Sequence, residues 1–399
     1  MAYHFSEMQL RVFQKYCKQQ RNKNWLQDCR MIILEHILPT TQSMIELLLE
    51  AGTDIYAVFA KPYSIDNTSL NALEAKELNI IKKSYDELEE DSIILDTLNS
   101  AIAQSKEDGK KIILLDVGGY FAKPLQQIEK SDLKYIWGVV EDTTFGHNRY
   151  LESKDNIDVP IYSVARSNLK EVEAHFVGRD AVLAVDTVLR DIGVLLSGRR
   201  SLVIGYGMIG KNVAIALRNS GMKVSVYDNR DHRNLTAYID GFDIHKKKEL
   251  IKSADIIFFA TGNPSGALTM DEIEECKNNV ILASVGSKNT EFAVKEIEDQ
   301  AIDKKEIGKR SEQDKPYLVE YSLSNDRHII VVKEGTAVNF ILPSLSVEVL
   351  DLVFSEILLC VLQLLKNHES DEIKLHTINT IRDENLNAIA KDWLRIVNN

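Results

Sequence analysis

The chain has 399 residues, which is long enough for two domains with well-buried cores. Its 60 acidic and 48 basic residues give a formal net charge of -12, and so acidic a protein is excluded as a binder of nucleic acid or of an anionic membrane. The four cysteines are widely spaced and form no C-x-x-C pair. We therefore expect reduced thiols, a cytoplasmic location, and neither a disulfide framework nor a metal site.

Short apolar runs alternate with helix-period segments in the first half of the chain, which is typical of a parallel α/β sheet. The apolar runs predict strands over residues 31–38, 54–60, 111–117, 135–141 and 160–164. The segments between them predict helices, among them residues 40–50, 71–83 and 85–105.

The same alternation continues in the second half. An apolar stripe predicts a long helix over residues 179–196. Strands are predicted over residues 202–205, 223–228, 255–260, 280–285 and 328–332, and a last long helix over residues 347–365. The hydrophilic stretch 301–316 is interpreted as an exposed loop or helix end.

The most apolar long segment is the predicted helix 347–365. It contains Glu348, Asp351 and Glu356, and charges at these places favour a buried amphipathic helix over a membrane span. The N-terminal residues MAYHFSEMQL lack the apolar core of a signal peptide, so we expect no targeting segment.

Gly205, Gly207 and Gly210 have the spacing G-x-G-x-x-G between a predicted strand and a predicted helix. In a dinucleotide-binding βαβ unit the three glycines give a tight turn, an unobstructed backbone beside the pyrophosphate, and close helix–strand packing. Met208 and Ile209 begin the helix, whose first amide groups then face the two phosphates.

An acidic residue, Asp228, ends the second strand of this unit, where a carboxylate accepts hydrogen bonds from an adenosine ribose. A 2′-phosphate would meet that carboxylate, so the motif predicts NAD rather than NADP. Arg230, two residues further on, leaves NADP open as an alternative.

Further sequence strings line up in order with one family. They are DVGG at 116–119, GVVEDTTFG at 138–146, PIYSV at 160–164 followed by Lys170, GYGMIGK at 205–211 and TGN at 261–263. In this order they resemble S-adenosylhomocysteine hydrolase, whose corresponding strings are DDGGD, GxxEETTTG, NDSVTK and GYGxVGK. The resemblance runs from about residue 31 to about residue 354.

The resemblance implies a particular architecture: an α/β fold in which a Rossmann NAD-binding domain, residues 179–344, is inserted into a discontinuous parallel α/β substrate domain. The first part of that domain is residues 1–178, and C-terminal helices in residues 345–399 return to it. A homo-oligomer, dimer or tetramer, is also implied, with a small molecule as the substrate.

The resemblance also implies a reaction. A tightly held NAD oxidises the ribose 3′-hydroxyl to a ketone, which acidifies the C4′ proton so that the 5′ substituent leaves by elimination. Water then adds, and the stored hydride is returned.

Roles carried over by the resemblance fall on four candidate catalytic positions. His36 matches an acid or base near the leaving group, and Lys170 matches the lysine that takes the 3′-hydroxyl proton. Asp142 stands where a glutamate reads the ribose, and His175 stands where the family has an asparagine. From the residues alone, each of the first two has an alternative interpretation. His36 can be a strand-end histidine bonded to the backbone, and Lys170 can be a solvated helix lysine.

The predicted cofactor-binding residues come from four parts of the chain. They are Thr143, Thr144, Gly205, Gly207, Met208, Ile209, Gly210, Asp228, Thr261, Gly262, Asn263 and Asn339.

The substrate side departs from the family. Val117 replaces the catalytic aspartate of DDGG, Ala174 replaces the aspartate that pairs with the lysine, and Ser287 replaces a histidine. Asp116 remains next to Val117, but successive strand residues point to opposite faces, so Asp116 cannot take over the role unless the strand end is bulged.

Three cationic side chains appear where the family has acidic or neutral residues: Arg166, His175 and Arg179. If they face the substrate, they favour an anionic group on it. Alternatively, Arg179 simply pairs with Asp180 or Glu173 on a wet surface.

These observations predict an NAD-dependent enzyme that oxidises a secondary hydroxyl of a nucleoside-like or sugar-like substrate, with elimination or epimerisation through the ketone as possible later steps. One alternative is a catalytically inactive NAD-binding relative that acts as a regulator or oligomer partner. Another is an ordinary hydroxy-acid or amino-acid dehydrogenase, which exchanges NAD and NADH freely.

Overall fold

The computed structural model describes residues 9–20, 24–90, 92–263, 266–286, 289–311, 314–324, 326–343, 345–367 and 373–397. The chain forms two compact units. The first unit contains the chain up to Lys170 and again from Ser346, and the second unit contains Glu171–Leu345. The inserted α/β arrangement predicted from the sequence is confirmed.

The first unit is built on a parallel seven-stranded sheet with strand order β15-β6-β5-β4-β1-β2-β3. The strands are β1 (Cys29–Ile37), β2 (Asp54–Ile65), β3 (Ile80–Lys82), β4 (Lys111–Asp116), β5 (Ile136–Glu141), β6 (Ile161–Ser163) and β15 (Ile378–Asn379). The central strands are almost wholly buried because helices cover both faces of the sheet, as parallel sheets require.

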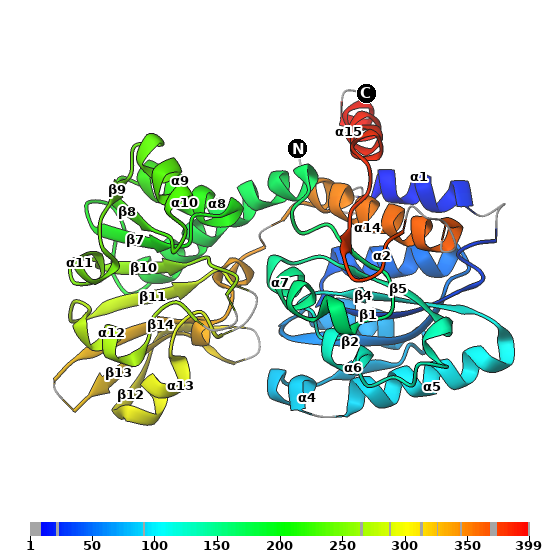
Figure 1. Ribbon diagram of the computed structural model, residues 1–399. Coiled ribbons are helices and arrows are strands. Elements are labelled where there is room, and N and C mark those ends of the chain that lie inside the picture. Colours follow the sequence, from blue (N-terminus) through cyan, green and yellow to red (C-terminus); the bar gives the residue numbers. More distant parts are fainter. Residues whose placement is uncertain are drawn as a thin grey trace. The chain divides into compact units, whose positions relative to one another are not determined.

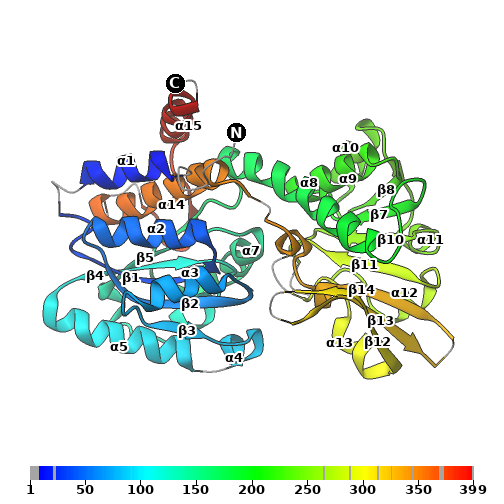
Figure 2. The ribbon, with the colours of Figure 1, turned by 180° about the vertical axis from the view of Figure 1, so that it is seen from behind.

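The helices of this unit lie in two layers (Figures 1 and 2). Helices α2 and α14 lie on one face of the sheet and α5 lies on the other, while α1 packs on α14. The helices are α1 (Arg11–Gln20), α2 (Pro39–Glu50), α3 (Asn67–Glu74), α4 (Tyr85–Glu90), α5 (Ile93–Asp108), α6 (Ala122–Leu125), α7 (Thr144–Ser153), α14 (Val347–Asn367) and α15 (Asp383–Val397). None of the described helices is long and apolar enough to cross a membrane.

The second unit has an eight-stranded sheet with strand order β12-β13-β14-β11-β10-β7-β8-β9. The strands are β7 (Arg200–Ile204), β8 (Lys223–Tyr227), β9 (Asp243–Ile244), β10 (Ile256–Phe259), β11 (Val280–Ser284), β12 (Ala301–Arg310), β13 (Pro316–Leu323) and β14 (His328–Val332). All neighbours are parallel except β12–β13 and β13–β14, which are antiparallel.

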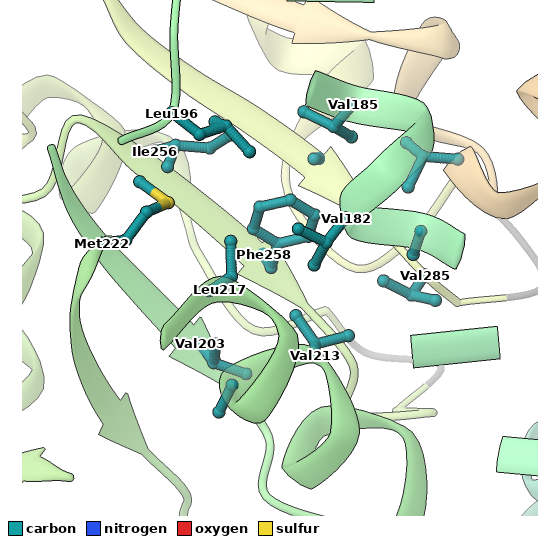
Figure 3. Packing of buried hydrophobic residues seen from close by; sticks show 14 of the residues in the cluster. Val182, Val185, Leu196, Val203, Val213, Leu217, Met222, Ile256, Phe258 and Val285 are labelled. Atoms are coloured by element: carbon teal, nitrogen blue, oxygen red, sulfur yellow. The ribbon is translucent and has the colours of Figure 1, made fainter. Parts of the chain in front are cut away.

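Successive side chains of the second sheet point to opposite faces and pack into two separate hydrophobic cores. Val203, Ile256 and Phe258 pack under α8 (Asn168–Arg190) and α9 (Met208–Asn219), as Figure 3 shows. Ile257 and Phe259 pack on the other face. The remaining helices of this unit are α10 (Asp231–Ile239), α11 (Lys247–Ile251), α12 (Met270–Glu275) and α13 (Val294–Gln300).

Two predicted elements are wrong at sheet edges. The predicted helix 71–83 is α3 followed by edge strand β3, because Asp66 caps α3 earlier and Glu77 has a positive φ of 59° that ends helical conformation. The stretch 301–316 is edge strand β12 and the start of β13 rather than a loop or helix end. Its charged residues are those that exposed edge strands carry.

The long helix predicted over residues 179–196 is also misplaced, since α8 runs from Asn168 to Arg190. Gly178 does not end a helix. A Cβ there would lie 2.6 Å from the Asn212 Cβ, so this glycine permits close packing of α8 on α9. The units accordingly divide after Lys170, not after residue 178, and again after Leu345. The predicted helix 85–105 is two helices, α4 and α5.

Asp351, one of the charged residues in the apolar helix α14, has a structural role. Its buried carboxylate accepts hydrogen bonds from the backbone N–H groups of Val12 (2.8 Å) and Phe13 (2.9 Å), which lie in the first turn of α1. These amides have no partner within their own helix. Asp351 therefore fixes α1 to α14.

We predict that Asp351→Ala lowers the free energy of unfolding by roughly 2–4 kcal/mol, because it leaves two buried amides without an acceptor. Urea unfolding measures the change, and hydrogen exchange should accelerate at Val12 and Phe13. Glu348→Ala on the same helix is the matched control. Equal effects of the two substitutions would contradict the capping role.

Candidate functional site

Each sheet has one topological switch point. In the first unit the chain adds β2 and β3 on one side of β1, and β4, β5 and β6 on the other. In the second unit β8 and β9 lie on one side of β7, and β10 and β11 on the other. Ligands of open parallel sheets bind beyond the carboxyl ends of the strands at such points.

Glu141, the last residue of β5, organises the strand ends of the first unit. Its fully buried carboxylate accepts hydrogen bonds from the backbone N–H groups of Gly118, Gly119 and Thr143 and from the Thr143 hydroxyl. A Cβ on Gly146 would lie 2.2 Å from the Glu141 Cδ, so position 146 must be glycine while this carboxylate stays in place. Glu141 thus joins the end of β4, the end of β5 and the start of α7.

Thr143 and Thr144 begin α7. Thr143 is its N-cap, and its hydroxyl oxygen accepts from the Gly146 N–H at 3.0 Å. The threonine and glycine of the string GVVEDTTFG therefore have a local structural role, whichever ligand Thr143 and Thr144 contact.

Asp142 and Lys170 form an ion pair beside this turn. The Lys170 Nζ lies 2.8 Å from both carboxylate oxygens of Asp142. The two side chains are only 13% and 17% exposed, so Lys170 is not a solvated helix lysine. The structure brings these two predicted residues into direct contact.

Two further buried carboxyl groups interact electrostatically with this pair. Burial raises the pKa of Glu35 to about 8, with Asp142 adding to the rise and Lys170 opposing it. Burial likewise raises the pKa of Glu356 to about 7. The Ser167 hydroxyl donates to Glu356 at 2.6 Å and accepts from the Lys170 backbone N–H at 3.1 Å, which links α14 to the first turn of α8.

His36 lies near the end of β1, next to Glu35. Its Nδ1 is hydrogen-bonded to the Ser64 hydroxyl, and its ring meets the Tyr63 ring edge-on with centroids 5.6 Å apart. Its backbone N–H donates to the Glu35 carboxylate at 2.9 Å. The half-buried imidazole is therefore oriented by a hydroxyl side chain rather than by the backbone carbonyl considered above.

Asp116 does not replace the missing aspartate at Val117. Its buried carboxylate accepts from the Tyr150 hydroxyl (2.6 Å) and the Phe121 N–H (3.0 Å). The strand end is not bulged in a way that turns this side chain to the other face, as the alternation of strand side chains implies.

A buried lysine lies beside Val117 instead. The Lys61 Nζ donates to the Val117 carbonyl at 3.0 Å. It also lies 4.8–5.8 Å from the ring centroids of Tyr63, Tyr85 and Tyr120. Where the resemblance places a carboxylate, this chain has an apolar side chain and a nearby cation.

The three cationic residues that suggested an anionic substrate are exposed. Arg166 donates to the Asn148 side chain at 3.0 Å, and the His175 Nδ1 lies 3.2 Å from the Asn212 Oδ1. Arg179 forms the surface ion pair with Asp180 that was the alternative interpretation, at 2.8 Å. His175 and Arg179 also belong to the second unit, whereas His36, Asp142 and Lys170 belong to the first.

The glycine motif of the second unit has the geometry that a dinucleotide requires. A Cβ on Gly210 would lie 1.8 Å from the Gly205 carbonyl oxygen, and a Cβ on Gly205 would lie 2.5 Å from the Ala260 carbonyl oxygen. Both glycines therefore permit backbone packing between β7, α9 and β10. Gly207 is the N-cap of α9, with Met208 and Ile209 in its first turn and no side-chain cap on its amides.

Asp228 follows β8 and is buried. Its carboxylate accepts from the Tyr206 N–H (2.7 Å) and the Arg230 N–H (2.9 Å), which fixes it beside the glycine turn. A carboxylate has about four acceptor sites, so it retains capacity for ribose hydroxyls. Together with the glycine geometry, this arrangement fits NAD.

Thr261, Gly262 and Asn263 follow β10. A buried carboxylate holds Thr261 and Gly262, and the Asn263 N–H donates to the Thr261 hydroxyl at 3.0 Å. Glu291 accepts from the Thr261 hydroxyl and from the Gly262 N–H at 2.9 Å. Asn339 is buried in the short helix Val338–Ile341 after β14. Ser287, which replaces a family histidine, lies outside the described residues.

Comparisons with known proteins find similarity to one family. Residues 175–343 match the family model described as S-adenosyl-L-homocysteine hydrolase, NAD binding domain. Adenosylhomocysteinase of Thermotoga maritima is 26% identical over 365 residues, 90% of this chain and 86% of the relative. That of Aeropyrum pernix is 28% identical over 90% of this chain and 83% of the relative, and that of Sulfurisphaera tokodaii is 26% identical over 98% and 91%. The chain is therefore similar to adenosylhomocysteinases over most of its length, and its residues 175–343 resemble the NAD-binding domain of that family.

The match to an NAD-binding domain model confirms NAD as the cofactor predicted from the glycine motif, and together with the similar adenosylhomocysteinases it supports an NAD-dependent enzyme. The roles of the individual site residues stay predictions, as do a cytoplasmic location and a homo-oligomeric state.

Sequence analysis did not assign Glu35, Lys61, Glu291 or Glu356 to the site. Of these four, only Glu356 could have been recognised from the sequence, because a charge inside an apolar helix requires a buried partner. The other three become visible only when the fold brings strand ends and loops together.

The raised pKa of Glu356 predicts how the stability of the protein changes with pH. Its folded-state pKa of about 7 lies above its ordinary value of 4.5, so the folded protein keeps a proton that the unfolded chain loses between these values. This group therefore makes stability fall as the pH rises through that window. We predict that Glu356→Gln removes the fall, so that its stability relative to the wild type rises by roughly 2–3 kcal/mol between about pH 5 and about pH 8.

Chemical denaturation at a series of pH values measures this difference. Glu384→Gln, at a side chain that is 72% exposed, is the control and should show no such trend. A stability difference for Glu356→Gln that is the same at both ends of the range would contradict the raised pKa.

Proposed function

We propose that this enzyme uses NAD to oxidise a secondary hydroxyl of a nucleoside-like or sugar-like substrate, and that the resulting ketone then allows elimination or epimerisation. The observation that carries the proposal is the Lys170–Asp142 ion pair directly beyond β5. NAD, when bound, supplies the hydride acceptor.

The ion pair suits a hydroxyl group. Lys170 offers an N–H to a hydroxyl oxygen, and Asp142 offers acceptor sites to a hydroxyl proton. An adjacent cation and anion therefore match a pair of neighbouring hydroxyls, as on a sugar ring. Asp142 also holds the Lys170 Nζ in one place, which reduces the entropy lost when the substrate binds.

An alcohol that gives up a hydride must also give up its hydroxyl proton. We assign Lys170 as the group that takes it, in the neutral amine form. Asp142 favours the charged form, so Lys170 must first release a proton. Glu356, whose pKa is raised to about 7, is partly ionised near neutral pH and can take up that proton, and it interacts electrostatically with Lys170. Glu35, whose pKa is raised to about 8, already carries its proton there.

The step after oxidation is assigned to His36. A ketone acidifies the proton on the neighbouring carbon, and an imidazole oriented by the Ser64 hydroxyl can remove or return a proton there. The family aspartate is absent at Val117, and Lys61 adds positive charge nearby. We therefore propose a substrate other than adenosylhomocysteine. We also propose that the substrate carries an anionic group.

We predict that the NAD-loaded protein, mixed with a panel of nucleosides and sugars, develops the near-ultraviolet absorbance of reduced nicotinamide with at least one of them. Lys170→Ala should slow this reaction by about 10²–10⁴-fold, the usual contribution of a general acid or base. Stopped-flow absorbance measures the rate.

Lys154→Ala is the matched control, because Lys154 forms an ion pair with Asp155 at the same 2.8 Å distance but lies at the end of α7, away from the strand ends. It should leave the rate unchanged. Removing the reacting hydroxyl from an active compound should abolish the reaction. Reduction that persists in Lys170→Ala, or that no compound in the panel produces, would contradict the proposal.

A further inference from the structure

Arg233 occupies a defined place beside the glycine turn of the second unit. It lies in the first turn of α10, and its Nη1 is 3.3 Å from the Asp228 Oδ2. The same guanidinium faces Gly207. A Cβ built on that glycine would lie 3.6 Å from the Arg233 Nη1 and 3.9 Å from both Cζ and Nη2. Arg233 therefore bridges the residue that approaches the pyrophosphate and the residue that reads the ribose.

The contact with Asp228 does not use the full capacity of this side chain. It joins one nitrogen to one oxygen at a long distance, whereas a guanidinium has five N–H donors in a planar fork. The Arg233 side chain is 31% exposed, and partly exposed ion pairs contribute little stability. Redirecting part of the guanidinium toward a ligand therefore costs little.

Other cations near the glycine turn are engaged elsewhere. Lys211 pairs with Asp240 at 2.9 Å. Arg218 donates to the Asp240 carbonyl and lies over the Phe242 ring, 4.5 Å from its centroid. Arg230 is exposed, and its backbone N–H, rather than its guanidinium, contacts Asp228. Within the described part of the chain, the guanidinium of Arg233 is the cationic group that lies against Gly207.

We propose that Arg233 binds the diphosphate of NAD. With the cofactor in place, the guanidinium donates to the phosphate that lies against Gly207, while Asp228 turns its remaining acceptor sites to the ribose hydroxyls. The α9 amides and the guanidinium then neutralise the diphosphate from two sides. This inference depends on NAD binding and not on the reaction proposed above, so it survives if that reaction is wrong.

The same position allows a different role. Asp228 lies where the adenosine ribose binds, so Arg233 could instead meet a phosphate on the ribose 2′-hydroxyl and admit NADP. The orientation favours the diphosphate, because three guanidinium atoms lie within 3.9 Å of the Gly207 Cβ position and only Nη1 reaches Asp228. The experiment separates the two roles.

Calorimetric titration of protein freed of nucleotide, with NAD⁺, ADP, adenosine and NADP⁺ as probes, tests the proposal. Arg233→Gln should weaken NAD⁺ and ADP by about tenfold to a hundredfold, the usual value of a hydrogen bond to a charged group, and adenosine by less than about twofold. Arg230→Gln removes the same charge from the N-cap of the same helix and should bind all four probes like the wild type.

Three outcomes would overturn the proposal. Equal loss of adenosine and NAD⁺ affinity in Arg233→Gln would mean that Arg233 acts only by holding Asp228. Equal losses in Arg230→Gln and Arg233→Gln would mean a general charge effect. Unchanged NAD⁺ affinity, with or without loss of NADP⁺, would exclude the diphosphate contact.

Arg233→Lys keeps the charge but not the planar fork, and it should lose an intermediate part of the NAD⁺ affinity. If Arg233→Gln does not fold, Arg233→Lys replaces it as the test of the proposal. The melting temperature measured without nucleotide shows whether each variant folds. An Arg233→Lys protein that folds normally and binds NAD⁺ like the wild type at several salt concentrations would count against a bidentate contact.

Discussion

The buried carboxylate of Glu141 is the interaction on which the substrate side of this enzyme depends. It receives hydrogen bonds from the turn after β4 and from the start of α7, and it leaves no room for a side chain on Gly146. Burial and neighbouring Asp116 raise its pKa well above the ordinary value, and the hydrogen bonds from Thr143 and Gly118 oppose that rise. Because Asp142 is the next residue along, Glu141 fixes where Asp142 meets Lys170. The residues of the string GVVEDTTFG therefore form one hydrogen-bonded junction between strand ends and helix.

The two units differ in how far they keep the family's apparatus. The second retains each element that a dinucleotide needs: backbone contacts that only glycine permits, an uncapped helix start, and a fixed carboxylate beside it. In the first, Lys170 persists and pairs with Asp142, but Ala174 stands in place of the family aspartate that pairs with the lysine, and Val117 lies next to the cation of Lys61. The match of residues 175–343 to an NAD-binding domain model agrees with this retention. A substrate can differ, and the residues that recognise it can change with it.

The central strands could be predicted because strands buried on both faces appear as continuous apolar runs. Strands β3 and β12 were missed because each forms the edge of its sheet and exposes much of its surface, so it lacks that pattern. The long helix predicted over residues 179–196 starts eleven residues earlier in the structure, and Gly178 lies inside it, where it allows close packing on α9. The family strings marked Asp142 and Lys170 separately as site residues, and only the fold shows that they form an ion pair. Glu35 and Glu356 come from β1 and α14, and no local spacing connects them to Lys170.

The central claim is that the bound cofactor takes a hydride from a carbon that carries a hydroxyl group. The most direct measurement uses a reacting compound labelled with deuterium at that carbon, followed by mass spectrometry of the nucleotide released from the denatured protein. When the reaction is quenched after the oxidation step and before the hydride is returned, the nicotinamide cofactor should carry one deuterium, and Lys170→Ala should suppress the transfer. A labelled compound that forms its ketone while the quenched cofactor carries no deuterium would contradict the claim.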